Sequence, residues 1–250
     1  MSTRRRLDAD LVRRGLVDSR SDGQALINQH RILVNGSIAE KSSRLVAPGD
    51  QVVVCGPSAR FVGRGGLKLD HALDQFGLDV TGLRVLDAGA STGGFTDCVL
   101  QRGAAHVIAV DVGHGQLHER LRADPRVTNM ERTNVRLLTT EMIGGPVELV
   151  TGDLSFISLR LVIGPLVSVC KPGALMVLLV KPQFEAGRSE VSRGRGVISD
   201  PAVWSRVREE VEQAFIKAGC AVVSWTDSPI SGADGNREFL LHALSPEGNV

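Results

Sequence analysis

From Arg84 onward, short apolar runs alternate with stretches of helical periodicity. The apolar runs have the length of buried strands and lie at residues 85–87, 107–111, 149–151, 175–180, 221–225 and 239–243. The clearest helix is expected at residues 200–218, where Asp200 can cap the amino end and Pro201 occupies the first turn. Such alternation is typical of a mostly parallel sheet with helices on both faces, so we predict an α/β fold for this part of the chain.

The segment at residues 6–54 has a different pattern. Apolar residues at helical spacing, with Ser19 or Ser21 as a cap for the second stretch, predict two short helices. A short apolar strand then runs into Asn35-Gly36, a pair that favours a hairpin. This pattern predicts a small α+β unit ahead of the α/β body.

A turn-rich break at residues 56–59 separates the two patterns, so we expect two domains, residues 1–59 and 60–250, with a linker at about residues 56–63. The charges differ between the two parts. Residues 1–64 carry 11 Lys/Arg against 6 Asp/Glu, whereas the remainder carries 18 against 22. A basic module on a mildly acidic body indicates that the module binds a polyanion, although a solvated surface is the simpler alternative.

Cysteine usage and hydropathy indicate a cytoplasmic protein without a metal site, a disulfide framework or a membrane segment. No apolar stretch follows the basic start, so no signal peptide is expected. The most apolar window, residues 161–180, is interrupted by Pro165 and by Lys171-Pro172-Gly173, which argues against a membrane span. The cysteines are far apart and form no CxxC pair: Cys55, Cys98, Cys170 and Cys220.

A glycine-rich run at residues 89–94 lies between a strand that ends near Asp87 and a helix that begins near Phe95. Glycines are needed where the backbone closely approaches a ligand. A dinucleotide fingerprint would need GxGxxG, which Ala90-Ser91 interrupts, and a P-loop would need a lysine where Phe95 stands. The remaining interpretation is a site for S-adenosylmethionine, which carries no phosphate and therefore needs no such lysine. A purely structural glycine turn is the alternative.

Ionisable residues follow or end three of the expected strands. Asp111, 24 residues after Asp87, ends the second strand, where its carboxylate can accept hydrogen bonds from both ribose hydroxyls of a nucleoside. Lys181 follows six apolar residues, an unusual place because desolvation penalises an ammonium group. A snorkelling or ion-paired lysine is the alternative. Asp153 opens the tetrapeptide Asp153-Leu154-Ser155-Phe156. Some methyltransferases that act on amino groups carry a proline-rich tetrapeptide at this place, so the absence of proline disfavours methylation of base nitrogens.

Several motifs carry a resemblance to a known family, and they lie at residues 63–69, 86–96, 153–158, 180–185 and 235–239. On these motifs, residues 60–250 resemble the FtsJ-like ribose 2'-O-methyltransferases, whose fold is Rossmann-like with a seven-stranded, mostly parallel sheet. Residues 6–54 are similar to the small S-four RNA-binding domain. Together the two parts resemble the TlyA family, which is historically labelled haemolysin.

The resemblance implies S-adenosylmethionine as the cofactor and a cytidine ribose of 16S or 23S rRNA, or of both, as the methyl acceptor. It implies ribosomal RNA and ribosomal subunits as partners, and we expect the protein to be a monomer without a membrane partner. It also implies a catalytic tetrad formed by Lys68, Asp153, Lys181 and Glu238.

Physical chemistry gives the tetrad a separate rationale. A ribose hydroxyl is a very weak acid, so a base must remove its proton as the methyl group transfers. A lysine can do this only in its neutral form, which burial beside a second cation favours. Lys181 is therefore our candidate base and Lys68 the neighbouring cation, with Asp153 and Glu238 orienting the two lysines.

The remaining candidate residues fall into two sets. Asn134 joins the cofactor set because a third strand should deliver it beside the adenine. The cofactor set is Asp87, Gly89, Ala90, Ser91, Thr92, Gly93, Gly94, Phe95, Asp111 and Asn134. The set expected to bind RNA phosphates is Arg4, Arg5, Arg13, Arg20, Arg31, Arg64, Arg188, Arg193 and Arg195.

Two other functions compete with this interpretation. A non-catalytic RNA-binding or ribosome-assembly factor would be expected to lack a tetrad residue or the glycine turn, and this sequence lacks neither. A membrane-active haemolysin would need a membrane span or a strongly amphipathic exposed helix, and the sequence predicts neither.

Overall fold

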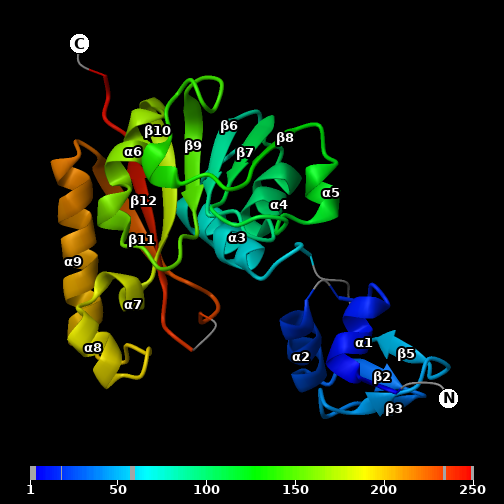
Figure 1. Ribbon diagram of the computed structural model, residues 1–250. Coiled ribbons are helices and arrows are strands. Elements are labelled where there is room, and N and C mark those ends of the chain that lie inside the picture. Colours follow the sequence, from blue (N-terminus) through cyan, green and yellow to red (C-terminus); the bar gives the residue numbers. More distant parts are fainter. Residues whose placement is uncertain (1–3, 18, 57–59, 233–234, 249–250) are drawn as a thin grey trace. The chain divides into compact units, whose positions relative to one another are not determined.

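The computed structural model describes residues 4–17, 19–56, 60–232 and 235–248, without the side chains of Arg188, Ser189 and Arg193. Its contacts divide the chain into two compact units, Met1–Ala59 and Arg60–Val250 (Figure 1). Within the described residues, no helix combines the length and the apolar character that crossing a membrane requires.

The amino-terminal unit packs two helices against short strands. Ser19 caps the second helix, since its hydroxyl accepts a hydrogen bond from the backbone N–H of Asp22. Asn35 and Gly36 both have positive φ angles, 52° and 81°, as the predicted hairpin turn requires. The elements are β1 (Arg5–Arg6), α1 (Leu7–Arg13), α2 (Arg20–Asn28), β2 (Ile32–Val34), β3 (Ser37–Ile38), β4 (Leu45–Val46) and β5 (Val52–Val54).

The second unit is built on a sheet in which the described residues form seven strands, in the order β11-β12-β10-β9-β6-β7-β8. Only β12 runs against its neighbours, so the sheet is mostly parallel, as predicted. The strands are β6 (Arg84–Ala88), β7 (His106–Val110), β8 (Val127–Met130), β9 (Val147–Gly152), β10 (Cys170–Val180), β11 (Ala221–Asp227) and β12 (Phe239–Leu244). Strand β10 begins earlier than its apolar run predicts, and its pairing with β9 is irregular between Cys170 and Leu175.

Helices cover both faces of this sheet (Figure 1). Alternate strand residues point to opposite sides: Leu86 packs in one core with α6 and α9, and Val85 in another with α3 and α4. The helices are α3 (Gly65–Phe76), α4 (Gly94–Gln101), α5 (Glu119–Arg122), α6 (Ile163–Ser168), α7 (Pro182–Glu185), α8 (Arg188–Arg193) and α9 (Pro201–Lys217), with 3-10 turns η1 (Val135–Leu137) and η2 (Leu159–Leu161).

Strand register brings the candidate residues to one edge of the sheet. Gly152 of β9 pairs with Ala88 of β6 and with Leu178 of β10, so these three parallel strands end together. The antiparallel strand β12 begins where they end, because Phe239 pairs with Val180. Residues that follow the parallel strands therefore share an edge with the residue that precedes β12.

Candidate active site

The glycine-rich loop between β6 and α4 is held close to neighbouring backbone. Gly89 has φ +84°, and a Cβ atom there would lie 2.9 Å from the carbonyl oxygen of Asp153. A Cβ atom on Gly94 would lie 2.8 Å from the backbone nitrogen of Gly66, in the motif that opens α3. Larger residues would push the loop away from both segments, which explains glycine at these two positions.

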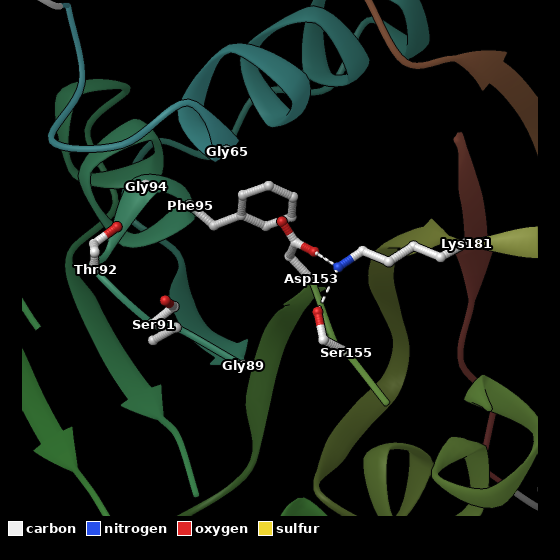
Figure 2. Close-up of a pocket in the computed structure, with 10 residues that line it drawn as sticks. Gly65, Gly89, Ser91, Thr92, Gly94, Phe95, Asp153, Ser155 and Lys181 are labelled. Carbon is white, nitrogen blue, oxygen red and sulfur yellow. Dashed lines mark hydrogen bonds and ion pairs between the residues drawn. The ribbon is translucent and has the colours of Figure 1, made fainter. Parts of the chain in front are cut away.

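This loop forms one wall of a pocket that also reaches the strand ends (Figure 2). Lys181 and Asp153 lie on the opposite wall from the loop residues. The glycine turn and the candidate catalytic groups therefore share one cavity. Its lining is Gly65, Gly89, Ala90, Ser91, Thr92, Gly94, Phe95, Asp153, Ser155 and Lys181.

The four predicted tetrad residues are joined in a chain of alternating charges. Lys181 Nζ lies 2.5 Å from Asp153 Oδ1, and Lys68 Nζ lies 3.9 Å from Asp153 Oδ2. Lys68 Nζ also donates a hydrogen bond of 2.6 Å to Glu238 Oε2. The chain is thus Glu238–Lys68–Asp153–Lys181. Both lysine side chains are only 9% exposed, so the carboxylates offset charges that would otherwise be costly to bury.

Each tetrad residue is delivered by a different element. Asp153 follows β9, Lys181 follows β10, Glu238 precedes β12, and Lys68 lies in the first turn of α3. Residues far apart in the sequence meet because the register of the sheet aligns these ends.

Asp87 does not line the pocket, although we predicted it as a cofactor residue. Its side chain is completely buried and accepts a 2.6 Å hydrogen bond from Thr96 Oγ1 in α4. The pKa of Asp87 is raised to about 7, mainly by burial and in part by the negative charge of Asp153, while the hydrogen bond from Thr96 opposes the rise. Asp87 therefore ties the end of β6 to the helix that follows the glycine loop.

Asp111 shapes the glycine loop. Its Oδ2 accepts a 2.8 Å hydrogen bond from the backbone N–H of Ser91, and its Oδ1 accepts one of 2.7 Å from Gly113. Each carboxylate oxygen keeps a second lone pair for a ligand hydroxyl. Asn134 lies beside this segment, since Thr133 N–H donates to the carbonyl oxygen of Asp111, and the Asn134 side chain caps η1. Asp111, Asn134 and Gly93 are not part of the pocket wall.

Two lining residues were missing from the predicted set. Gly65 opens α3, and the hydroxyl of Ser155 accepts a 2.9 Å hydrogen bond from Lys181 Nζ (Figure 2). Both lie in the recognised motifs, which was the available signal. Phe156 is also notable, because it is 91% exposed at φ +62° and its ring lies 5.2 Å from that of Phe184.

The arginines predicted to contact RNA have mixed surroundings. Arg13 and Arg20 form ion pairs with the buried carboxylates of Asp10 and Asp8, so both also stabilise the amino-terminal unit. Arg31 donates to the carbonyl oxygen of Cys55. Arg64 donates to the carbonyl oxygen of Ser231. Arg4, Arg5 and Arg195 are exposed, whereas the side chains of Arg188 and Arg193 lie outside the described part of the chain.

Comparisons with known proteins agree with this fold. A model for FtsJ-like methyltransferases matches residues 61–244, and a model for the S4 domain matches residues 5–52. The sheet order, the glycine turn and the family match define an S-adenosylmethionine-dependent methyltransferase with a Rossmann-like fold.

Individual relatives narrow the assignment. The 16S/23S rRNA (cytidine-2'-O)-methyltransferase TlyA of Mycobacterium tuberculosis is 48% identical, over 99% of this chain and 95% of that enzyme. The 23S rRNA (cytidine-2'-O)-methyltransferase TlyA of Campylobacter jejuni is 30% identical, over 90% of this chain and 94% of that enzyme. A solved structure of a hemolysin from Streptococcus thermophilus is 37% identical, with a TM-score of 0.79 and coverage of 99% and 90%. The chain belongs to the TlyA branch of the FtsJ-like methyltransferases.

Proposed function

We propose that the protein methylates the ribose 2'-hydroxyl of a cytidine in ribosomal RNA. The observation that carries this proposal is the buried contact between Lys181 and Asp153 in the same pocket as the glycine turn. A base and a methyl-donor site then lie in one cavity. The names of the relatives support rRNA as the substrate and cytidine as the nucleoside.

The glycine loop fits the methyl donor. Gly89 and Gly94 let the loop pack directly against the backbone of Asp153 and Gly66, which places loop backbone in the pocket wall. No lysine is needed because the donor has no phosphate. S-adenosylmethionine supplies the methyl group in an already activated sulfonium form. We assign the ribose hydroxyls of the cofactor to Asp111 and its adenine end to the segment near Asn134, while Asp87 holds the loop from behind.

Lys181 acts in this proposal as the general base. In its neutral form, Lys181 Nζ would accept the proton of the ribose 2'-hydroxyl as the hydroxyl oxygen displaces the sulfonium sulfur from the methyl carbon. Asp153 and Ser155 hold Nζ at the pocket wall by contacts of 2.5 and 2.9 Å. Lys68, fixed by Glu238, adds positive charge that stabilises the developing negative charge on the acceptor oxygen.

RNA binding is assigned to the amino-terminal unit and to the pocket mouth. The match to the S4 domain supports contacts between the predicted arginines and RNA phosphates. Phe156 places an exposed ring beside the pocket residue Ser155, and an unstacked base can bind such a ring. We further propose that the substrate is a ribosomal subunit, that the enzyme works as a monomer and that it acts in the cytoplasm.

The test is transfer of labelled methyl groups to separated 30S and 50S subunits, followed by digestion of the RNA to nucleosides. We expect the label in 2'-O-methylcytidine. A transcript already 2'-O-methylated at the target should accept no further label. Label in a base-methylated nucleoside, or undiminished transfer to the pre-methylated transcript, would contradict the proposal. Because the two TlyA relatives differ in their named substrates, both subunits are assayed.

A further inference from the structure

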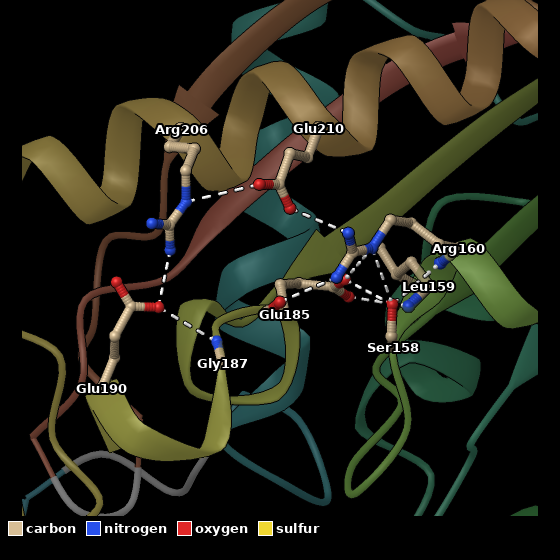
Figure 3. Close-up of polar contacts among 8 residues, drawn as sticks. All are labelled: Ser158, Leu159, Arg160, Glu185, Gly187, Glu190, Arg206 and Glu210. Carbon is tan, nitrogen blue, oxygen red and sulfur yellow. Dashed lines mark hydrogen bonds and ion pairs between the residues drawn. The ribbon is translucent and has the colours of Figure 1, made fainter. Parts of the chain in front are cut away.

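A second buried carboxylate lies close to the tetrad and has no role in the chemistry above. Glu185 ends α7, the short helix that directly follows Lys181, and its side chain is only 2% exposed. Its Oε2 accepts a 2.5 Å hydrogen bond from Ser158 Oγ, and its Oε1 accepts one of 2.7 Å from the backbone N–H of Leu159 (Figure 3). A buried carboxylate persists only when such partners replace water.

Arg160 supplies the compensating charge. Its Nε lies 3.3 Å from Glu185 Oε2, and its guanidinium also donates to the backbone carbonyl of Glu185 at 2.8 Å. The other side of the guanidinium forms a 2.8 Å ion pair with Glu210 of α9. Glu185 and Arg160 together therefore connect η2, α7 and α9.

The partners of Glu185 belong to the end of the loop that carries Asp153 and Ser155. The start of this loop is fixed by β9 and by a 3.1 Å hydrogen bond from Asp153 N–H to the carbonyl oxygen of Ala88. Its end is fixed by the two bonds to Glu185. Between these anchors, Phe156 adopts φ +62°, a conformation that a side chain other than glycine keeps only when its surroundings enforce it.

These contacts fix the position of the loop relative to Lys181. The loop provides both polar contacts to Lys181 Nζ, from Asp153 and from Ser155, and the helix that begins after Lys181 provides Glu185, which holds the far end of the loop. We propose that Glu185 is a positioning residue that fixes the loop at residues 153–158 relative to Lys181 and so sets the geometry of methyl transfer. This inference rests on the proposed role of Lys181 in methylation.

The principal variant is Glu185→Gln. The amide can still accept the hydrogen bond from Leu159, but its NH₂ group would face Arg160 and Ser158 as another donor. We expect the single-turnover rate constant for methyl transfer to fall by on the order of tenfold to a hundredfold, because small misplacement of reacting groups has effects of this size. The Kd of S-adenosylmethionine should be unchanged, since Glu185 is not part of the pocket wall.

A matched control is Glu148→Gln. Glu148 also accepts a backbone N–H, that of Arg84 at 2.9 Å, and also pairs with a cation, Lys171 at 2.7 Å. It lies near the start of β9, the strand whose other end leads to Asp153. This variant should keep the wild-type rate constant, so an equal loss in both variants would identify general destabilisation and overturn the proposal.

Hydrogen exchange of the Leu159 amide gives a readout that does not depend on the acceptor. Exchange should accelerate in Glu185→Gln and not in Glu148→Gln. Ser158→Ala, which removes one hydroxyl from the same network, should lower the rate constant less than Glu185→Gln does, and it decides the question if the glutamine variant does not fold. Wild-type transfer rates in a folded Glu185→Gln, or in Ser158→Ala when only that variant folds, would overturn the positioning role. A wild-type enzyme that does not methylate ribose would overturn the proposed function instead, while the exchange measurement would still report on the loop.

Discussion

The two lysines of the tetrad are equally buried but have different neighbours. Lys68 contacts two carboxylates, Glu238 at 2.6 Å and Asp153 at 3.9 Å. Lys181 contacts one carboxylate, Asp153, and the neutral hydroxyl of Ser155. Two negative charges stabilise an ammonium group more than one does. The difference supports the proposal that Lys68 supplies the fixed positive charge and Lys181 the proton acceptor.

The location of the two lysines supports the same division. Lys181 lines the pocket together with the glycine loop, whereas Lys68 is not among the lining residues and lies 3.9 Å from one of them, Asp153. A proton acceptor must reach the substrate hydroxyl, but a fixed positive charge can act from a greater distance. The comparison therefore makes different predictions for the two ends.

The largest effect is expected at the Lys181 end. Lys181→Ala removes the proposed base and should lower the rate of methyl transfer by about a thousandfold, within the usual range for general bases. The variant should still fold and bind S-adenosylmethionine, which calorimetric titration can check. Turnover close to that of the wild type would remove Lys181 from the role of base.

Breaking the link between the two ends should have the next largest effect. Asp153→Asn keeps the shape of the side chain but removes the charge that both lysines share. We expect a loss on the order of a hundredfold in single-turnover rate, because both lysines lose a fixed partner. A loss confined to the KM for RNA would show instead that Asp153 acts in substrate binding.

A third prediction uses the pH dependence of stability at Asp87 to test whether Asp153 carries a negative charge. The pKa of Asp87 is raised from 3.8 to about 7, first by burial and in part by the negative charge of Asp153. A carboxyl group whose pKa is raised on folding stabilises the protein while protonated, so its contribution is lost as the pH rises from 3.8 towards about 7. Asparagine does not titrate, so the free energy of unfolding of Asp87→Asn should rise relative to that of the wild type as the pH increases over this range. The expected increase is on the order of a few kcal/mol.

Denaturant unfolding across this pH range provides the measurement. A stability difference between the wild type and Asp87→Asn that does not change with pH would show that Asp87 does not titrate as described. In the Asp153→Asn background the gain should be smaller, because one cause of the raised pKa is absent. An unchanged gain would mean that Asp153 carries no negative charge at this site, and this would contradict the comparison of the two lysines, which requires that charge.

The sequence was sufficient for the elements whose signals are local. Apolar runs located the strands before Asp153 and Lys181, and Asp200 capped α9 as expected. Strand β10 is longer than predicted, because the segment around Pro172 and Gly173 joins it through irregular pairing with β9. Hydropathy does not reveal this contact.

The site was harder to predict because its contacts depend on register. Glu238 precedes an antiparallel strand, and no local pattern indicates that this strand begins beside Val180; only the resemblance pointed to it. Ser155 was missed because its contact depends on the reach of Lys181, 26 positions away. Asp111 was predicted to bind the ribose of the cofactor, and the hydrogen bond by which its carboxylate holds Ser91 could not be predicted because it depends on the loop geometry.

The most direct test of Lys181 as the base compares two substitutions of equal bulk, Lys181→Arg and Lys68→Arg. Arginine keeps the positive charge but does not lose its proton in proteins, so it can replace a fixed cation and cannot replace a base. Single-turnover methyl transfer to rRNA should be abolished in Lys181→Arg and only reduced in Lys68→Arg, with S-adenosylmethionine bound by both. Clear transfer by Lys181→Arg, or a greater loss in Lys68→Arg, would contradict the division of roles between the two lysines.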